Sequence, residues 1–114
     1  MPFIEVKTNA RADDAICEAV KSELGKAISL IPGKSEEWLM VNVSCGEKIW
    51  FAKEASGKCA MVKIAVYGKI SDRDANRLTA RVTQIVSENF DVEPDRIYVA
   101  YSEHDKWGWN GSDF

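Results

Sequence analysis

The stretch CAMVKIAVYGKISDRDANRLTARVTQIV, residues 59–86, decides the fold. Its first nine residues, 59–67, alternate apolar side chains with others, which is typical of a strand with one buried face. Ser71 and Asp74 then form the pattern of a capping box, which marks the start of a helix. The apolar stripe of that helix consists of Ala75, Leu78, Val82, Ile85 and Val86. Because RIYVAY, residues 96–101, reads as a further strand, this half of the chain is predicted to form a strand, a helix and a strand.

The N-terminal half repeats the same plan. PFIEVKT, residues 2–8, alternates as a strand, and apolar residues then recur at helical spacing over residues 16–31 until Pro32 and Gly33 stop the helix. A strand is predicted next in WLMVNVS, residues 38–44, and a short one in KIWF, residues 48–51. The chain is therefore expected to contain two successive β-α-β units.

A duplicated β-α-β chain with right-handed crossovers places both helices on one face of a single mixed sheet. Because strand side chains alternate, one face is predicted to be wholly apolar and to lie under the helices. Its members are Ile4, Val6, Leu39, Val41, Val43, Ala60, Val62, Ile64, Val66, Ile97 and Val99. The opposite face mixes charges with large apolar groups such as Trp38, Met40 and Tyr98, an unusual surface for a monomer. We therefore predict an α/β (α+β) fold whose subunits surround a wet central space.

Composition and charge exclude several classes of protein. A chain of 114 residues with 46% hydrophobic and 29% charged residues is expected to form one globular domain over residues 1–114. The net charge of -3 and the scattered lysines and arginines provide no basic patch, which argues against nucleic-acid binding. No apolar run reaches the length of a membrane span, and the first residues lack the pattern of a signal peptide. We therefore expect a cytoplasmic protein that does not bind membranes.

The three cysteines, Cys17, Cys45 and Cys59, are odd in number and show neither CxxC nor histidine spacing. This pattern predicts neither a disulfide framework nor a zinc site. We interpret all three as buried or incidental thiols.

Pro2 has two interpretations that the residues alone leave open. A proline at the first position of a strand removes no hydrogen bond from the sheet, so its role can be purely structural. Alternatively, removal of Met1, which a small second residue permits, would leave Pro2 with a free secondary amine that binds and releases a proton. An α-amino group titrates at about 7.7 to 8.0 and a secondary amine higher, so a base at neutral pH needs a lowered pKa. Burial and a nearby cation both lower the pKa of an amine.

Short motifs occur in order along the whole chain: MP at residues 1–2, GK at 33–34, YGKI at 67–70, PDRIY at 94–98 and WNGSDF at 109–114. Together with the doubled β-α-β order, they resemble the macrophage migration inhibitory factor family, which includes D-dopachrome tautomerase, within the tautomerase superfamily. The resemblance implies a homotrimer whose sheets surround a solvent channel, with the C-terminal residues adding edge strands to the neighbouring subunit. We accordingly expect Trp109 and Phe114 to pack across subunits.

The same resemblance implies a keto-enol tautomerase that uses no cofactor and no metal. Its substrates would be phenylpyruvate-like α-keto acids, with dopachrome as a further candidate. Pro2, freed of Met1, is the implied general base and acid. Lys34 is the implied ligand of the substrate carboxylate, although outside the family such a residue is an ordinary solvated loop lysine. The other implied substrate-binding residues are Phe3, Trp38, Tyr67, Trp107 and, from the adjacent subunit, Tyr98.

Three positions depart from the pattern of the mammalian members. Tyr67 stands where isoleucine is usual, Ala100 where asparagine is usual, and Trp107 where a smaller apolar residue is usual. Alanine cannot hydrogen-bond a substrate hydroxyl, whereas the hydroxyl of Tyr67 can, so the polarity and width of the pocket stay open. The mammalian CxxC pair is also incomplete, because Val62 occupies the position of the second cysteine. Thiol oxidoreductase activity through that motif is therefore not expected.

A second class of function stays open at this point. Members of the family signal outside the cell without a signal peptide, so the chain could be a secreted, cytokine-like binding protein whose enzyme site is vestigial. Its partner would then be a receptor protein instead of a small-molecule substrate.

Overall fold

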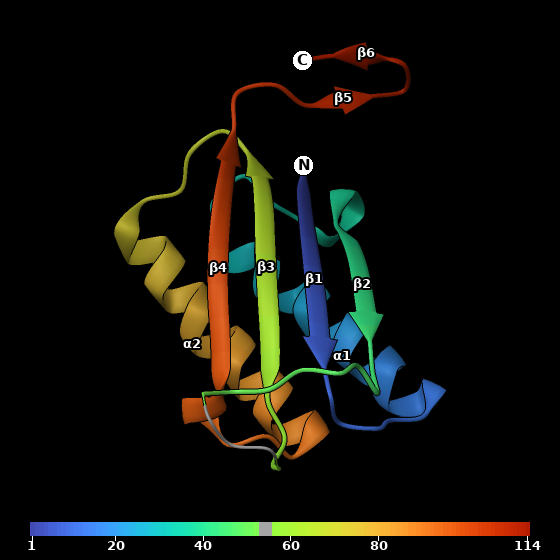
Figure 1. Ribbon diagram of the computed structural model, residues 1–114. Helices are drawn as coiled ribbons and strands as arrows, with labels where there is room; N and C mark the ends of the chain where they lie inside the picture. The colour runs from blue at the N-terminus through green and yellow to red at the C-terminus, as the bar shows by residue number, and fades with distance from the viewer. Residues whose placement is uncertain (53–55) are drawn as a thin grey trace.

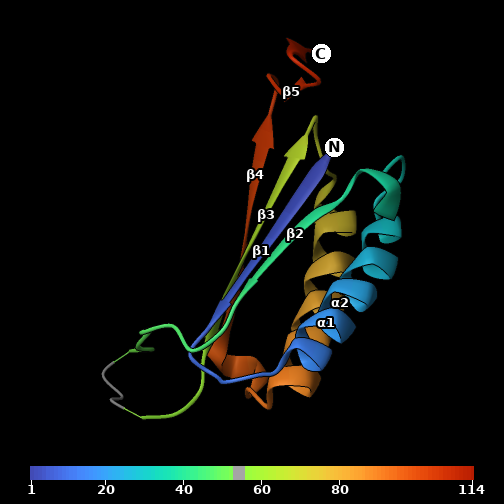
Figure 2. The same cartoon turned by 90° about the vertical axis from the view of Figure 1, so that its right-hand side faces the viewer.

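Two helices cover one face of a four-stranded sheet in the computed structural model, which describes residues 1–52 and 56–114 (Figure 1). The view from the side shows both helices on the same face and the other face open (Figure 2). The strands of the sheet are β1 (Pro2–Thr8), β2 (Met40–Ser44), β3 (Ala60–Tyr67) and β4 (Ile97–His104). The helices are α1 (Asp14–Ala27) and α2 (Asp72–Phe90), and the short 3-10 helices are η1 (Ile28–Leu30), η2 (Glu36–Trp38) and η3 (Pro94–Arg96).

The order of the strands confirms the duplicated β-α-β plan. In the sheet order β2-β1-β3-β4, β1 runs parallel to β2 and β3 runs parallel to β4. Each parallel pair is connected by one helix, α1 in the first half and α2 in the second. The two halves meet where β1 and β3 pair antiparallel, with Ile4 opposite Ile64. The sheet is therefore mixed, as the sequence predicts.

The core lies between the sheet and the helices, and it consists of the strand face that alternation predicts. Val6, Val62 and Ile64 are fully buried, and Val41, Val43 and Val99 are partly buried against the same core. The helices contribute the facing layer: Val20, Leu24, Ala27, Leu78, Val82, Ile85, Val86 and Phe90. The open face instead exposes large groups, with Met40 69% and Tyr98 62% exposed.

Both helices begin at side-chain caps. The carboxylate of Asp13 accepts a hydrogen bond of 2.9 Å from the backbone N–H of Ile16, and the hydroxyl of Ser71 accepts one of 3.1 Å from that of Asp74. Such caps satisfy N–H groups that lack a partner within the helix. The first helix ends earlier than its apolar pattern suggests, because its last turn tightens into η1. Among the described residues, no helix combines the length and apolarity that crossing a membrane requires.

Two local predictions are wrong. Trp38 belongs to η2, not to the strand, which begins only at Met40. KIWF, residues 48–51, forms no strand and contributes only an isolated bridge at Phe51. A strand needs a neighbour for its backbone groups, and within the described residues this segment joins neither edge of the sheet β2-β1-β3-β4.

The C-terminal residues form a small hairpin that stands beyond one end of the sheet (Figure 1). Its strands are β5 (Gly108–Trp109) and β6 (Ser112–Asp113). Asn110 and Gly111 connect them with φ values of 52° and 84°, as a tight hairpin turn with two left-handed residues requires. The N-terminus of the chain lies at the same end of the sheet.

Candidate active site

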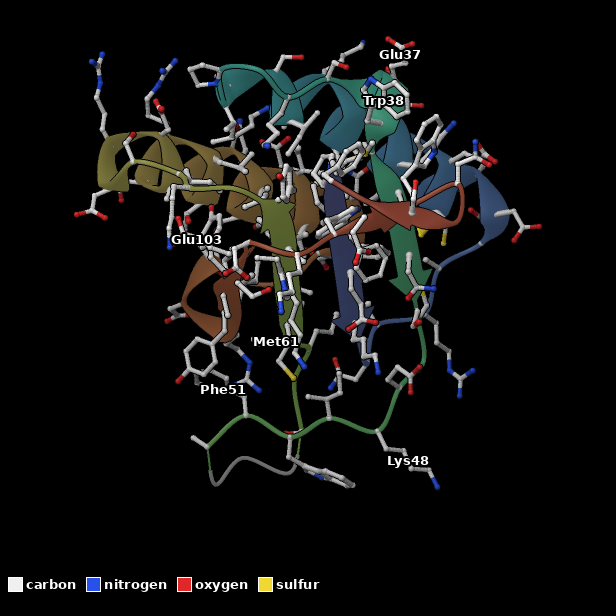
Figure 3. The ribbon with its side chains drawn as sticks, turned by 90° about the horizontal axis from the view of Figure 1, so that it is seen from above. Glu37, Trp38, Lys48, Phe51, Met61 and Glu103 are labelled. Carbon is white, nitrogen blue, oxygen red and sulfur yellow. The ribbon has the colours of Figure 1, made fainter. Side chains whose placement is uncertain are left out.

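A cavity of about 370 Å³ lies at this end of the molecule, where three distant parts of the sequence meet. The start of β1 supplies one wall, η2 and the start of β2 supply the second, and the C-terminal hairpin supplies the third. The lining residues are Met1, Pro2, Phe3, Glu37, Trp38, Leu39, Met40, Trp107, Gly108 and Trp109. Figure 3 shows Glu37 and Trp38 together at the η2 wall. The cavity is therefore lined mainly by apolar and aromatic groups around the N-terminus.

Pro2 is buried and opens β1 opposite Val66. Its ring nitrogen has no hydrogen to donate, so the strand starts at a position where the missing donor costs nothing. In the full chain the free amine belongs to Met1. Partial burial and, second, the positive charge of Lys34 lower the pKa of this amine below its ordinary value. Both causes disfavour the ammonium form, so the environment favours an amine that is free to accept a proton.

Lys34 is held close to the N-terminus by the backbone of β3. Its ammonium group donates a hydrogen bond of 2.8 Å to the carbonyl oxygen of Tyr67, whose own N–H donates one of 3.1 Å to the carbonyl oxygen of Met1. These two contacts bring Lys34 and the N-terminus to the same strand end. A lysine has three N–H donors, so two stay available beyond the bond to Tyr67. In the part of the chain that the structure describes, no ion pair uses Lys34.

Aromatic pairs hold the C-terminal residues against the rest of the chain next to the cavity. Trp38 and Trp109 meet edge to face, with ring centroids 5.4 Å apart. Tyr67 packs against Phe114 at 5.4 Å, and His104 packs against Trp107 at 5.7 Å. These ring contacts anchor the C-terminal residues to their own chain. Each aromatic pair contributes stabilisation beyond that from the burial of its apolar area.

The structure brings together most of the residues that the resemblance implies. Pro2, Phe3, Trp38 and Trp107 line the cavity. Lys34 and Tyr67 adjoin it through the contacts to Met1 described above.

Tyr98 lies elsewhere. It pairs with Met61 at the far end of β4, where its ring contacts Phe51 at 5.2 Å, and Ala100 follows on the same exposed face. Figure 3 shows Phe51 and Met61 on the side of the sheet away from the helices. Tyr98 therefore takes no part in the cavity of its own chain, so its assignment to the site still depends on an adjacent subunit.

Sequence reasoning missed Trp109 as a residue of the cavity, because it assigned the tail to contacts between subunits. Its contact with Trp38 shows that the tail also shapes the cavity of its own chain. The high density of aromatic residues in 107–114 was the feature of the sequence that could have indicated this role.

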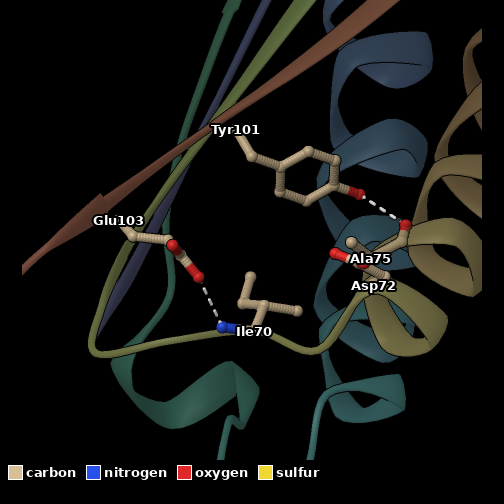
Figure 4. A pocket seen from close by; sticks show the side chains of 5 residues that line it. All are labelled: Ile70, Asp72, Ala75, Tyr101 and Glu103. Carbon is tan, nitrogen blue, oxygen red and sulfur yellow. Dashed lines mark hydrogen bonds between the residues drawn. The ribbon is translucent and has the colours of Figure 1, made fainter.

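A second cavity, of about 320 Å³, lies between β4 and the start of α2 (Figure 4). Two of its polar side chains, those of Tyr101 and Glu103, are already engaged. The hydroxyl of Tyr101 donates to the carbonyl oxygen of Ala75 at 2.9 Å, and the carboxylate of Glu103 accepts from the N–H of Ile70 at 2.7 Å. These bonds are explained by local structure, so the cavity at the N-terminus is the better candidate. No cluster of three or more possible metal ligands occurs within residues 1–52 and 56–114.

Comparisons with known proteins identify the family and the fold. The family model for macrophage migration inhibitory factor matches residues 1–114. A macrophage migration inhibitory factor of Leishmania major shares the fold with a TM-score of 0.92 at 24% identity, over 100% of this chain and 97% of that one. The homologue from Entamoeba histolytica has a TM-score of 0.87 at 20% identity, over 99% of this chain and 98% of that one.

A more distant structure shows how widely the fold extends. A protein inactivated by 2-oxo-3-pentynoate has a TM-score of 0.85 at 10% identity, over 97% of this chain and 94% of that one. The search of curated proteins gave no significant match. At these identities the structural neighbours establish the fold, a tautomerase fold, and the family model establishes the relationship. The chain therefore belongs to the macrophage migration inhibitory factor family.

Proposed function

We propose that the protein is a cofactor-independent keto-enol tautomerase of phenylpyruvate-like α-keto acids, with Pro2 as general base and acid once Met1 is removed. Family membership and the tautomerase fold support a tautomerase or cytokine-like function. The observation that carries the finer proposal is that the N-terminal amine, here the Met1 amine with its lowered pKa, lies with a lysine and an apolar cavity at one strand end. A structural neighbour that is inactivated by 2-oxo-3-pentynoate, itself an α-keto acid, adds support for this substrate class.

In this proposal the two free N–H donors of Lys34 hold the substrate carboxylate. The ring of the substrate lies among Phe3, Trp38 and Trp107. The unprotonated amine of Pro2 takes a proton from the carbon beside the keto group, and the proton returns to the carbonyl oxygen to give the enol. The reverse path uses the same groups, so no proton is gained or lost overall. Burial in the apolar cavity disfavours the charged form of the amine.

The substrate site is proposed to be complete only in a homotrimer, where Tyr98 of an adjacent subunit would close the cavity. Exposure of Tyr98 and Met40 on the open sheet face supports such an assembly, because monomers rarely expose many large apolar groups together. A cytokine-like protein with a receptor partner is the alternative, and the same exposed groups are compatible with it. Measured turnover of phenylpyruvate by the purified protein decides between the two, since a vestigial site gives none.

Lys34→Met is expected to raise KM for phenylpyruvate by roughly 10- to 100-fold, because a charge-assisted hydrogen bond to the carboxylate is lost. It should also move the acid limb of the pH profile of kcat/KM toward higher pH. The positive charge of Lys34 contributes to lowering the pKa of the Met1 amine. We expect it to act in the same direction on the amine of Pro2 once Met1 is removed, so loss of the charge should raise that pKa and keep the amine protonated to higher pH. Steady-state kinetics across the pH range measure both effects. An acid limb at the same pH as in the parent would show that Lys34 does not affect the pKa of the base.

Ala100→Asn is expected to shift the ratio of kcat/KM toward 4-hydroxyphenylpyruvate and away from phenylpyruvate by up to roughly a hundredfold. A buried hydroxyl without a partner costs about 1–3 kcal/mol, and asparagine would supply that partner. Ala100→Val, which adds size without a polar group, is the matched control. Strong preference of the parent for the hydroxylated acid, unchanged by asparagine, would show that position 100 does not face the substrate. The hydroxyl of Tyr67 would then be the candidate partner.

A further inference from the structure

Two of the three cysteines lie side by side, which the sequence analysis did not anticipate. The sulfur atoms of Cys17 and Cys45 are 3.6 Å apart, although the residues are separated by 28 positions in the chain. Cys17 lies in the first half of α1, and Cys45 directly follows β2. Both are free thiols and both are only partly buried, whereas Cys59 is buried.

A groove gives access to this pair. A cavity of about 290 Å³ between α1 and β2 is lined by Cys17 together with Asp14, Glu18, Lys21, Val41 and Val43. Lys21 and Glu18 form an exposed ion pair at its rim, with a distance of 3.6 Å. A small, charged thiol reagent in solution can therefore reach Cys17 without unfolding of the core.

We propose that Cys17 and Cys45 form an oxidisable dithiol, a modification site that a small disulfide such as oxidised glutathione converts into an intramolecular disulfide. A disulfide bond is about 2 Å long, so the sulfur atoms must approach by about 1.5 Å, which side-chain rotation on a helix and at a strand end can supply. The proposal is independent of tautomerase activity, because neither cysteine lines the cavity at the N-terminus.

The reaction proceeds by two thiol–disulfide exchanges. The thiolate of Cys17 attacks one sulfur of oxidised glutathione, which forms a mixed disulfide and releases one reduced glutathione. The thiolate of Cys45 then attacks the sulfur of Cys17, which closes the protein disulfide and releases the second glutathione. The protons of the two protein thiols end on the two glutathione thiols, so the protein is oxidised by two electrons and glutathione disulfide is reduced.

The order of attack follows from the surroundings of the two thiols. Cys17 lines the groove and is the accessible partner. Burial, and then the hydrogen bond with Cys17, raises the pKa of Cys45 to about 11, so Cys45 is mainly protonated at neutral pH. A protonated thiol is a poor nucleophile, so the first attack falls to Cys17. Once Cys17 is in the mixed disulfide, its thiol no longer hydrogen-bonds Cys45, which removes one cause of the raised pKa and lets Cys45 attack second.

Closing this bond would enclose the segment that carries the proposed substrate ligands Lys34 and Trp38. A cross-link stabilises a fold chiefly by restricting the unfolded chain, and a loop of this length lies in the range where the effect is substantial. We expect the melting temperature to rise by about 10 °C on oxidation. The rise should disappear after reduction with dithiothreitol.

The test treats the reduced, full-length protein with oxidised glutathione and follows intact mass, peptide mapping and melting temperature. The wild type and Cys59→Ser should each lose two hydrogen atoms and yield a peptide pair cross-linked between Cys17 and Cys45. Cys45→Ser should stop at one glutathione on Cys17, and Cys17→Ser should remain without a cross-link. Peptide mapping of the wild type alone identifies the bond, so the result does not depend on the folding of the variants.

Three outcomes would overturn the proposal. The first is a wild type that keeps glutathione on Cys17 and forms no cross-link. The second is a disulfide between two chains, seen as a dimer on a non-reducing gel. The third is a cross-link that involves Cys59.

Discussion

Replacing Pro2 with glycine is expected to lower kcat/KM for the tautomerisation of phenylpyruvate by about a hundredfold or more, because a positioned general base contributes roughly 10²–10⁴-fold. Glycine supplies a primary amine of different basicity on a freer backbone, so the nitrogen is held less firmly against the substrate. The fold should persist, since Pro2 donates no hydrogen bond to β3 that the substitution could remove. Steady-state kinetics and circular dichroism measure the two parts of this prediction.

A second variant isolates the role of the amine. Inserting one alanine between Met1 and Pro2 leaves Pro2 and the later residues of the cavity unchanged but keeps the nitrogen of Pro2 in an amide, which cannot accept a proton. This variant should lose activity at least as severely as Pro2→Gly. Intact mass of both proteins and of the parent establishes whether Met1 has been removed. If both variants turned over phenylpyruvate like the parent, the proline mechanism would be wrong and the signalling alternative would gain support.

Deleting residues 107–114 is expected to convert the proposed trimer to monomers at micromolar concentration and to reduce turnover to background. The deletion removes the hairpin wall of the cavity, including Trp107 and Trp109. It also removes side chains that are half exposed in the single chain, Trp109 at 50% and Phe114 at 53%, and that we expect to pack on a neighbour. Light scattering reports the mass of the assembly, and kinetics report the site.

Trp109→Ala separates the two roles of the hairpin. It keeps the backbone of β5 and β6 but removes the ring that meets Trp38. We expect this variant to lose activity while it keeps more of the trimer than the truncated chain does. A truncated protein as trimeric and as heat-stable as the parent would contradict the place assigned to the tail.

Most of the fold could be predicted because strand and helix periodicities are local properties of the sequence. The alternation of Ile4 and Val6, and that of Val62 and Ile64, identified the buried face, and Ser71 identified the start of α2. The segment KIWF could not be judged in the same way, because a strand depends on a partner that the segment itself does not contain. Trp38 lies in η2 because its backbone N–H bonds to the carbonyl oxygen of Ser35, and that of Leu39 bonds to the carbonyl oxygen of Glu36, which closes a helical turn.

The site was less predictable than the fold. Residues 2, 3, 38 and 107 were named from a resemblance, and their meeting in one cavity depends on how β1, η2 and the hairpin converge. The place of Trp109 on Trp38 and the proximity of Cys17 to Cys45 are contacts between elements distant in sequence. No periodicity encodes such contacts, because they arise only after the helices and strands have packed.

The position of the two chain ends has a practical consequence for handling the protein. Met1 lies in one wall of the cavity, and the N–H of Phe114 bonds to the carbonyl oxygen of Trp107 in the hairpin wall. An affinity tag fused at either end would therefore crowd the cavity, and a tag at the first residue would also acylate the amine. Fluorophores and immobilisation chemistry are better attached at the exposed outer surface of α2, at Glu88 for example, on the far side of the core. Measurements on protein tagged at the N-terminus would therefore underestimate the proposed tautomerase activity.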